Sequence, residues 1–301
     1  MDRQHPESFR GMVRAGRAIR RHHSSRWSRS GATCLLVAAC VLPAPSIAAD
    51  ISWLQLSDGI GVSVWKAQEQ CPIVPRMLVV DLDPARIKFS VHYYAHEGLS
   101  EPHRIDQWQK RTGHHVVFNA GLFRENFAYL GLLYKDGRPL GSRRHPSWRG
   151  LFVAEPSDSE LRKARVLDLD SEVFDEERPA YREAAQALML LDRTGRVRVR
   201  ETGKYAYQTI VAETAAGHIL LLKSLGAARL YDIAQCLKDV LPTVRQAMAM
   251  DGGSSSDIRI LESLWQKDIE TEDRTSWKSL FAGSTGSHIP LPTVIGASPR
   301  Y

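Results

Sequence analysis

The chain has 301 residues, of which 43% are hydrophobic and 25% are charged, which is the composition of an ordinary globular protein. The net charge of +6 lies entirely in residues 1–48, where eight arginines are opposed only by Asp2 and Glu7, and the rest of the chain is neutral. A nucleic-acid-binding domain carries its basic residues on the folded part, so this distribution argues against nucleic acid as a partner.

The N-terminal segment is typical of a secretory signal peptide. An arginine-rich stretch ends at Arg29, an apolar run occupies residues 34–42, and small residues follow at 46–49. We expect a signal peptide over residues 1–48, cleaved after Ala48 or Ala49, and one domain over residues 49–301. The apolar run is shorter than the about 20 residues that span a bilayer, and no later segment is suited to it. We therefore expect a periplasmic or secreted protein without a transmembrane segment.

The cysteines leave two questions open. Residues 36–40 resemble a bacterial lipobox, so a lipid anchor on Cys40 is the alternative to a freely exported protein. Cys71 and Cys236 remain after cleavage, and an oxidising compartment permits a disulfide between them. Two buried free thiols fit the sequence equally well, because cysteine is a common core residue.

Beyond residue 50 the pattern predicts mostly strands. Residues 61–65 and 87–91 alternate between apolar and polar side chains, as half-buried strands do, and residues 77–82 form a continuous apolar run typical of a buried strand. Asp136-Gly137 predicts a hairpin between two further strands. Additional turns are expected at residues 193–195 and 215–217.

Fewer segments favour helices. Ser100 is a candidate N-cap for a helix that carries Ile105 and Trp108, and apolar residues at helical spacing over 230–241 predict a second helix that ends at Pro242. These elements predict an α+β fold of one domain, with a mixed, twisted β-sheet and a few helices packed on it. The polar stretches 155–160 and 267–288 are expected to be surface insertions.

The first candidate site lies at the end of the apolar strand 116–118. Asn119 follows the strand directly, and Ala120-Gly121 come next. Ligand sites in sheet proteins often lie at strand ends, and glycine lets the backbone approach a ligand closely. A turn initiated by asparagine produces the same pattern.

The second candidate site follows the apolar strand 247–250. Asp251 is placed at the end of the strand, Gly252-Gly253 free the backbone, and three serines follow at 254–256. Successive backbone N–H groups in such a turn form an anion-binding nest, and serine hydroxyls add donors. A carboxylate beside a phosphate cradle suits sugar–phosphate chemistry.

Together these motifs resemble one known family. Asn119-Ala120-Gly121-Leu122-Phe123, Gly131-Leu132, Asp136-Gly137-Arg138 and Asp251-Gly252-Gly253-Ser254-Ser255 occur in the order found in bacterial phosphodiester glycosidases, and the similarity extends over residues 60–297. The resemblance implies a hydrolase that separates a sugar from the phosphate on its anomeric carbon. It implies a sugar-phosphate or glycan substrate and no cofactor. The spacing of the histidines and cysteines indicates no zinc motif.

The resemblance also suggests a role for each site residue. Asp251 is the expected catalytic carboxylate, Asn119 would hold sugar hydroxyls or phosphate, and Glu125 is the reserve carboxylate. Gln208 stands where the family usually has an arginine, so it keeps a hydrogen-bond donor and loses a charge. The expected substrate-binding residues are Gly121, Gly131, Gln186, Gln208, Gly252, Gly253, Ser254 and Ser255.

One carboxylate can suffice for this reaction. The departing phosphate monoester has a second pKa of about 6, so it leaves as a stable anion, whereas ordinary glycosidases generally use two carboxylates. The alternative function is a non-catalytic periplasmic protein that binds glycan, or assists exopolysaccharide assembly, with the same pocket.

Overall fold

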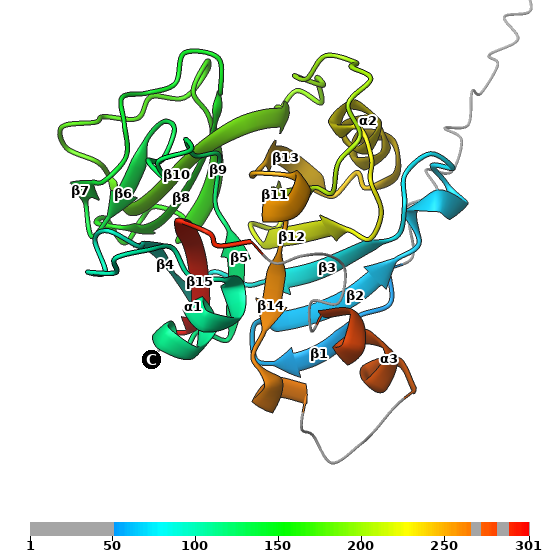
Figure 1. The fold of residues 1–301 in the computed structure, drawn as a ribbon. Helices are drawn as coiled ribbons and strands as arrows, with labels where there is room; N and C mark the ends of the chain where they lie inside the picture. The colour runs from blue at the N-terminus through cyan, green and yellow to red at the C-terminus, as the bar shows by residue number, and fades with distance from the viewer. Residues whose placement is uncertain (1–50, 266–271, 282–288, 301) are drawn as a thin grey trace, which may run out of the picture. The chain divides into compact units, whose positions relative to one another are not determined.

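In the part of the chain that the computed structural model describes, every strand pairing is antiparallel, and the strands build two sheets (Figure 1). The structure describes residues 51–265, 272–281 and 289–300. The expected signal peptide, its cleavage site and Cys40 lie outside the described residues. No helix within these ranges is long and apolar enough to cross a membrane.

The larger sheet has eleven strands. Its main path runs β1-β2-β3-β12-β11-β13-β10-β6-β7, and β8 and β9 extend it beside β10. The strands of this sheet are β1 (Leu54–Ser57), β2 (Ile60–Trp65), β3 (Met77–Leu82), β6 (Leu133–Lys135), β7 (Arg138–Pro139), β8 (Gly150–Pro156), β9 (Ala164–Asp168), β10 (Tyr181–Leu191), β11 (Thr209–Thr214), β12 (Ile219–Ser224) and β13 (Val244–Ala249).

The smaller sheet has four strands in the order β14-β5-β15-β4. These are β4 (Ile87–Tyr93), β5 (Val116–Asn119), β14 (Ile258–Ile260) and β15 (Thr293–Pro299). The α+β class is confirmed, but the pairing differs from the mixed sheet that the sequence led us to expect. Parallel neighbours need long crossover connections that are usually helical, and here several neighbours, such as β6 and β7 or β11 and β12, are joined by short turns instead.

Three α-helices accompany the sheets in the described part of the chain: α1 (Ile105–Thr112), α2 (Leu230–Val240) and α3 (Glu272–Phe281). The helix expected at residues 230–241 is confirmed. The expectation that Ser100 caps α1 is wrong, because the helix begins at Ile105 after Arg104. The chain is still extended at His103, which forms a β-bridge with Leu291. α3 lies within the polar stretch 267–288 that was expected to be a surface insertion.

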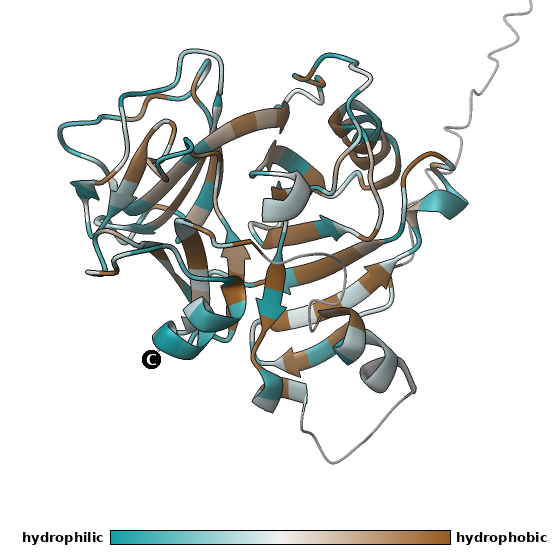
Figure 2. Ribbon diagram, in the orientation of Figure 1, coloured by the Kyte–Doolittle hydropathy of each residue, from teal (hydrophilic) through white to brown (hydrophobic). Residues whose placement is uncertain are grey.

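Many strand segments are hydrophobic along their length (Figure 2), and their buried side chains form two main hydrophobic clusters. One cluster contains residues of both sheets, including Phe89, Phe118 and Phe152, whose rings meet edge to face. The other joins the larger sheet to α2, where Ile233 and Leu237 pack with strand residues. The sheet is therefore buried on both faces around β11 and β13, and β13 leads into the second candidate motif.

Glutamates satisfy backbone groups on the open edge of β4. The N–H of Phe89 donates to Glu155 at 3.1 Å, and the N–H of Val91 donates to Glu183 at 2.6 Å. Glu155 and Glu183 come from β8 and β10, so these bonds join the smaller sheet to the larger one and satisfy donors that an edge strand leaves unpaired. Glu155, expected in a surface insertion, is thus part of the framework.

Cys71 and Cys236 form a disulfide, with their Cα atoms 5.9 Å apart. Cys71 follows the short 3-10 helix η1 (Ala67–Glu69), and Cys236 lies on α2. The bond decides between the two alternatives that the sequence left open. It fastens α2 to the segment that precedes β3.

Candidate functional site

The fold brings the two candidate motifs together. The backbone N–H of Asp251 donates to the carbonyl of Ala120 at 3.0 Å, and the side-chain amide of Asn119 donates to the carbonyl of Asp251 at 2.8 Å. Asn119 ends β5 in the smaller sheet, whereas Asp251 follows β13 in the larger one. The two motifs, 132 residues apart in sequence, therefore meet where the sheets adjoin.

Asp251 lines a pocket of about 460 Å³. This volume lies in the usual range for small-molecule sites. Gln208, Gly252 and Gly253, three of the expected binding residues, line the same pocket, and so do Trp148 and several apolar side chains. Among the described residues that line it, Asp251 is the only carboxylate.

The environment of Asp251 shifts the pKa of its carboxyl group. Burial raises the pKa of the Asp251 carboxyl above its ordinary value, while hydrogen bonds from Ser255 and from the backbone at Gly252, together with the charge of Lys204, act in the opposite direction. Desolvation is the largest of these effects. Asp251 therefore takes up a proton at a higher pH than an exposed aspartate, which suits a group that accepts a proton during catalysis.

The two glycines after Asp251 have different structural roles: Gly252 lets neighbouring groups approach closely, and Gly253 adopts a positive φ. A Cβ on Gly252 would lie 2.8 Å from Oε1 of Gln208 and 2.9 Å from the carbonyl of Tyr207. Gly253 has a φ of 68° and starts the 3-10 helix η2 (Gly253–Ser255). Its N–H donates to the carbonyl of Tyr207 at 2.8 Å. This donor of the expected phosphate-binding nest is therefore already used within the protein.

The serines of this motif differ in their placement. Ser255 is buried and hydrogen-bonded to Asp251, so it holds the carboxylate rather than facing an open pocket. Ser254 is exposed and does not line the pocket. Ser256 is also buried, and its hydroxyl meets that of Thr209 at 2.8 Å.

Asn119 lies behind the pocket rather than in its wall. Its side chain is 1% exposed, and its amide nitrogen donates to the carbonyls of Asp251 and Ala120 at 2.8 and 3.1 Å. Its amide oxygen accepts the N–H of Asp257 at 3.0 Å. Both amide hydrogens are thus committed to the backbone, and the contacts of Asn119 fix the position of Asp251.

Gln186 is fully buried and makes four hydrogen bonds to the backbone. Its Oε1 accepts the N–H groups of Leu132 and His145, each at 2.9 Å, and its Nε2 donates to the carbonyls of His145 and Trp148 at 3.0 and 2.5 Å. Trp148 stacks on His145, with ring centroids 3.8 Å apart. Gln186 thereby holds the segment that carries the pocket residue Trp148.

Gly121 and Gly131 pack against Gln186. A Cβ on Gly121 would lie 2.6 Å from the carbonyl of Gln186, and one on Gly131 would lie 2.6 Å from its Oε1. Gly131 also has a φ of 96°, which a side chain would strain. Both glycines contact this buried framework, and neither lines the pocket.

Of the two remaining predicted residues, Gln208 lines the pocket and Glu125 does not. Gln208 is 5% exposed and lines the pocket, and its Nε2 donates to the carbonyl of Ala228 at 3.1 Å. Glu125 is exposed on the loop between Phe123 and Tyr129 and does not line the pocket.

Sequence reasoning missed one wall of the pocket. Besides Gln208, the segment between β10 and β11 contributes six further lining residues: Arg198, Val199, Arg200, Thr202, Lys204 and Ala206. Arginine and valine alternate over residues 196–200, a pattern typical of a strand, but within this run only Val197 forms a β-bridge, with Leu191. The repeated basic residues were the sequence signal that could have indicated this wall.

No group of three or more histidine, cysteine, aspartate and glutamate residues within the described ranges could hold a metal ion.

The fold and the site define an antiparallel α+β protein with a carboxylate and basic side chains around one small-molecule pocket. The family model for phosphodiester glycosidases (NAGPA) matches residues 112–282. The chain belongs to the phosphodiester glycosidase family, which confirms the resemblance and supports a glycosidase-type function. No protein of curated function matches the sequence.

Two solved structures resemble this one. The catalytic domain of zebrafish N-acetylglucosamine-1-phosphodiester alpha-N-acetylglucosaminidase, auto-inhibited by its pro-peptide, gives a TM-score of 0.51 at 16% identity, over 83% of this chain and 82% of that one. A hypothetical protein from Synechocystis gives a TM-score of 0.51 at 13% identity, over 83% of this chain and 64% of that one. At these identities the similarity establishes a shared fold.

Proposed function

We propose that the protein is an exported hydrolase that cleaves a sugar from an anomeric phosphodiester, with envelope or extracellular glycans as substrates. The observation that carries the proposal is the placement of Asp251 in a chain of this family. Asp251 is the one carboxylate among the described lining residues of the pocket, and its pKa is raised by burial.

In the proposed reaction, water attacks the anomeric carbon and the bond between that carbon and the phosphate oxygen breaks. The electron pair of this bond leaves with the phosphate monoester, and Asp251 takes the proton of the attacking water. The leaving group needs no acid, because a phosphate monoester with a second pKa of about 6 is a stable anion near neutral pH. A single carboxylate in the pocket is consistent with a reaction that needs a base and no acid.

The other predicted residues take supporting roles in the proposal. Gln208 and Gly252 face the substrate from the pocket wall, and Ser255 orients Asp251. Asn119 and Gln186 act through the backbone that they hold. Glu125 is the alternative carboxylate, which its exposed position makes the second choice.

The test is an assay of reducing-sugar release from a panel of sugar-1-phosphodiesters. Release by the wild-type protein, with loss in Asp251→Asn and retention in Ser254→Ala, supports the proposal. Saturable retention of glycan without release supports the non-catalytic alternative. If the protein neither releases sugar nor retains glycan across the panel, both the catalytic and the non-catalytic function are contradicted.

Export is tested separately by mass spectrometry of protein from the envelope fraction. A new N-terminus at Ala49 or Asp50 is expected. A lipid-modified Cys40 identifies the anchored alternative. An intact Met1 in cytoplasmic protein contradicts export.

A further inference from the structure

Three basic residues on one pocket wall form a local concentration of positive charge. Arg198, Arg200 and Lys204 all belong to the segment between β10 and β11 and line the pocket beside Asp251. The chain beyond residue 48 is neutral overall, so composition alone does not account for this wall.

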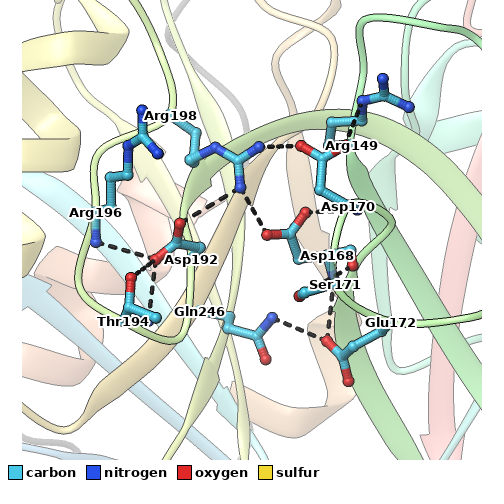
Figure 3. A network of polar contacts seen from close by, with 10 residues as sticks. All are labelled: Arg149, Asp168, Asp170, Ser171, Glu172, Asp192, Thr194, Arg196, Arg198 and Gln246. Atoms are coloured by element: carbon cyan, nitrogen blue, oxygen red, sulfur yellow. Dashed lines mark hydrogen bonds and ion pairs between the residues drawn. The ribbon is translucent and has the colours of Figure 1, made fainter. Parts of the chain in front are cut away.

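Arg198 is already neutralised by aspartates. Its guanidinium donates to Asp168 at 2.7 Å and to Asp192 at 3.4 Å, and it also contacts Asp170 (Figure 3). Arg149 pairs with Asp170 at 2.9 Å in the same network. These contacts fasten the segment to the end of β9 and leave Arg198 little charge to offer a ligand.

The same network shapes the turn before the wall. The carboxylate of Asp192 accepts hydrogen bonds from the backbone N–H groups of Thr194 and Arg196, at 3.0 and 3.1 Å, as Figure 3 shows. At the far end of the segment, Tyr205 packs against the guanidinium of Arg229, 5.6 Å from the ring centroid. The wall is therefore anchored on both sides of Arg200.

Arg200 and Lys204 differ from Arg198 in being uncommitted. Both are exposed, and neither makes a hydrogen bond or an ion pair within the described part of the chain. The charge of Lys204 acts on Asp251, where it lowers the pKa of the carboxyl against the larger effect of burial. The wall thus presents two available cations to a pocket that contains one carboxylate.

We propose that Arg200 and Lys204 bind the phosphate of the substrate and select substrates with an anionic leaving group. This inference rests on the proposed function. Gln208 is uncharged and one of its N–H groups is bonded to Ala228, so the positive charge must come from another part of the pocket. A guanidinium presents paired donors to phosphate oxygens, and an ammonium adds a point charge.

The two cations would also favour the reaction itself. A phosphodiester carries one negative charge, and the departing monoester approaches two as the bond to the anomeric carbon breaks. Cations placed beside that oxygen interact more strongly with the transition state than with the bound substrate, which is the condition for a catalytic effect.

The first test measures the binding of inorganic phosphate by ³¹P nuclear magnetic resonance titration, at low and high salt. Arg200→Gln and Lys204→Met should each weaken binding by about tenfold or more, since each removes a charged donor. Arg196→Gln is the matched control, because Arg196 is exposed on the same segment and does not line the pocket. The wild-type affinity should fall with added salt, and the fall should be smaller in the two pocket variants.

A wild-type protein that does not bind phosphate overturns the inference, and so do pocket variants that bind it as the control does. Because phosphate binding is measured without turnover, a wild-type protein that binds phosphate and releases no sugar refutes the proposed function alone.

A second measurement uses the carboxyl of Asp251 as a reporter. Lys204→Met should raise the pKa of Asp251, followed by carbon chemical shifts, because a stabilising charge is removed. Arg196→Gln should leave this pKa unchanged. An unchanged pKa in Lys204→Met would show that Lys204 does not face the pocket, which overturns its part in the inference.

Discussion

Lys223 and Asp257 form an ion pair of 2.8 Å in which the two side chains are 3% and 6% exposed. Lys223 lies on β12 of the larger sheet, and Asp257 directly precedes β14 of the smaller one. The backbone N–H of Asp257 donates to Asn119, so this pair joins the two sheets next to the candidate site.

Lys223→Met should therefore destabilise the protein strongly. It removes the buried ammonium that pairs with the carboxylate of Asp257, and removal of one member of a buried ion pair costs about 3–5 kcal/mol in comparable cases. The free energy of unfolding in urea measures it. Lys66→Met is the control, because the pair between Lys66 and Glu69 is well exposed and should contribute at most about 1 kcal/mol. Equal losses in the two variants would contradict a special role for the buried pair.

Asn119→Ala should lower both stability and turnover. The variant removes the hydrogen bonds that the Asn119 side chain makes to the carbonyl of Asp251 and to the N–H of Asp257, whereas the carbonyl of Ala120 keeps the bond from the N–H of Asp251. Buried polar groups that lose a hydrogen bond cost about 1–3 kcal/mol each. Turnover should fall because Asp251 loses its support. Asn126→Ala, on the exposed loop, should change neither quantity. Full stability in Asn119→Ala would show that water replaces the lost bonds.

Asp251→Asn should separate catalysis from folding. Asparagine can accept the hydrogen bond from Ser255 but cannot take a proton, so turnover should fall by at least about a hundredfold. The melting temperature should change by only a few degrees, because asparagine keeps the shape of the side chain and the hydrogen bond from Ser255 and removes a charge that burial penalises. A folded variant with near-normal turnover would move the assignment to Glu125.

The pH dependence of turnover gives a related test. Because burial raises the pKa of Asp251, turnover by the carboxylate form should decline on acidification at a higher pH than for an exposed aspartate. Ser255→Ala removes a hydrogen bond that lowers this pKa, so the acid limb should move to still higher pH. Ser254→Ala, at the exposed neighbour, should leave the limb in place.

His92 and His114 should make the protein less stable in acid. Their Nε2 atoms lie 2.8 Å apart, so one ring must accept a hydrogen bond in its neutral form. Burial and the neighbouring His92 lower the pKa of His114 from 6.5 to about 4, with Lys135 and His115 acting in the same direction and Glu97 against it. Ser298 bonds its Nδ1 at 2.7 Å.

The sign of the effect follows from proton binding. Below about pH 6.5 His114 is protonated in the unfolded chain, but in the folded chain it stays neutral down to about pH 4. Between these two values the free energy of unfolding therefore falls as the pH is lowered, by up to roughly 1.4 kcal/mol per pH unit. His114→Gln should flatten this dependence. His96→Gln, at an exposed site, should retain it, and an unchanged slope in His114→Gln would exclude the pair as its source.

Reduction of the disulfide should destabilise the fold. Cys71 and Cys236 are separated by 165 residues, and loss of a native disulfide in small domains typically costs about 2–5 kcal/mol. Urea unfolding with and without reductant measures the difference. The double variant Cys71→Ser, Cys236→Ser should be insensitive to reductant, and equal midpoints for the oxidised and reduced wild type would contradict the prediction.

The sequence alone determined several strands, one tight hairpin and the family. Alternating and continuous apolar runs predicted strands that the structure has as β2, β3 and β4, because side-chain periodicity reflects burial of one face or both. Asp136 and Gly137 have φ values of 51° and 77°, the backbone that a tight hairpin demands and that this residue pair tolerates. The order of the motifs indicated the family without any structure.

The tertiary structure alone decided which residues line the pocket. Asn119 and Asp251 look equally polar in sequence, yet the amide of Asn119 is consumed by backbone groups while Asp251 lines the pocket. Arg200 and Lys204 reach the same pocket from a segment without a recognised motif. Such differences depend on contacts between segments that are far apart in the chain. A local sequence pattern indicates how its own segment folds, but it does not indicate which distant backbone groups will form hydrogen bonds with its side chains.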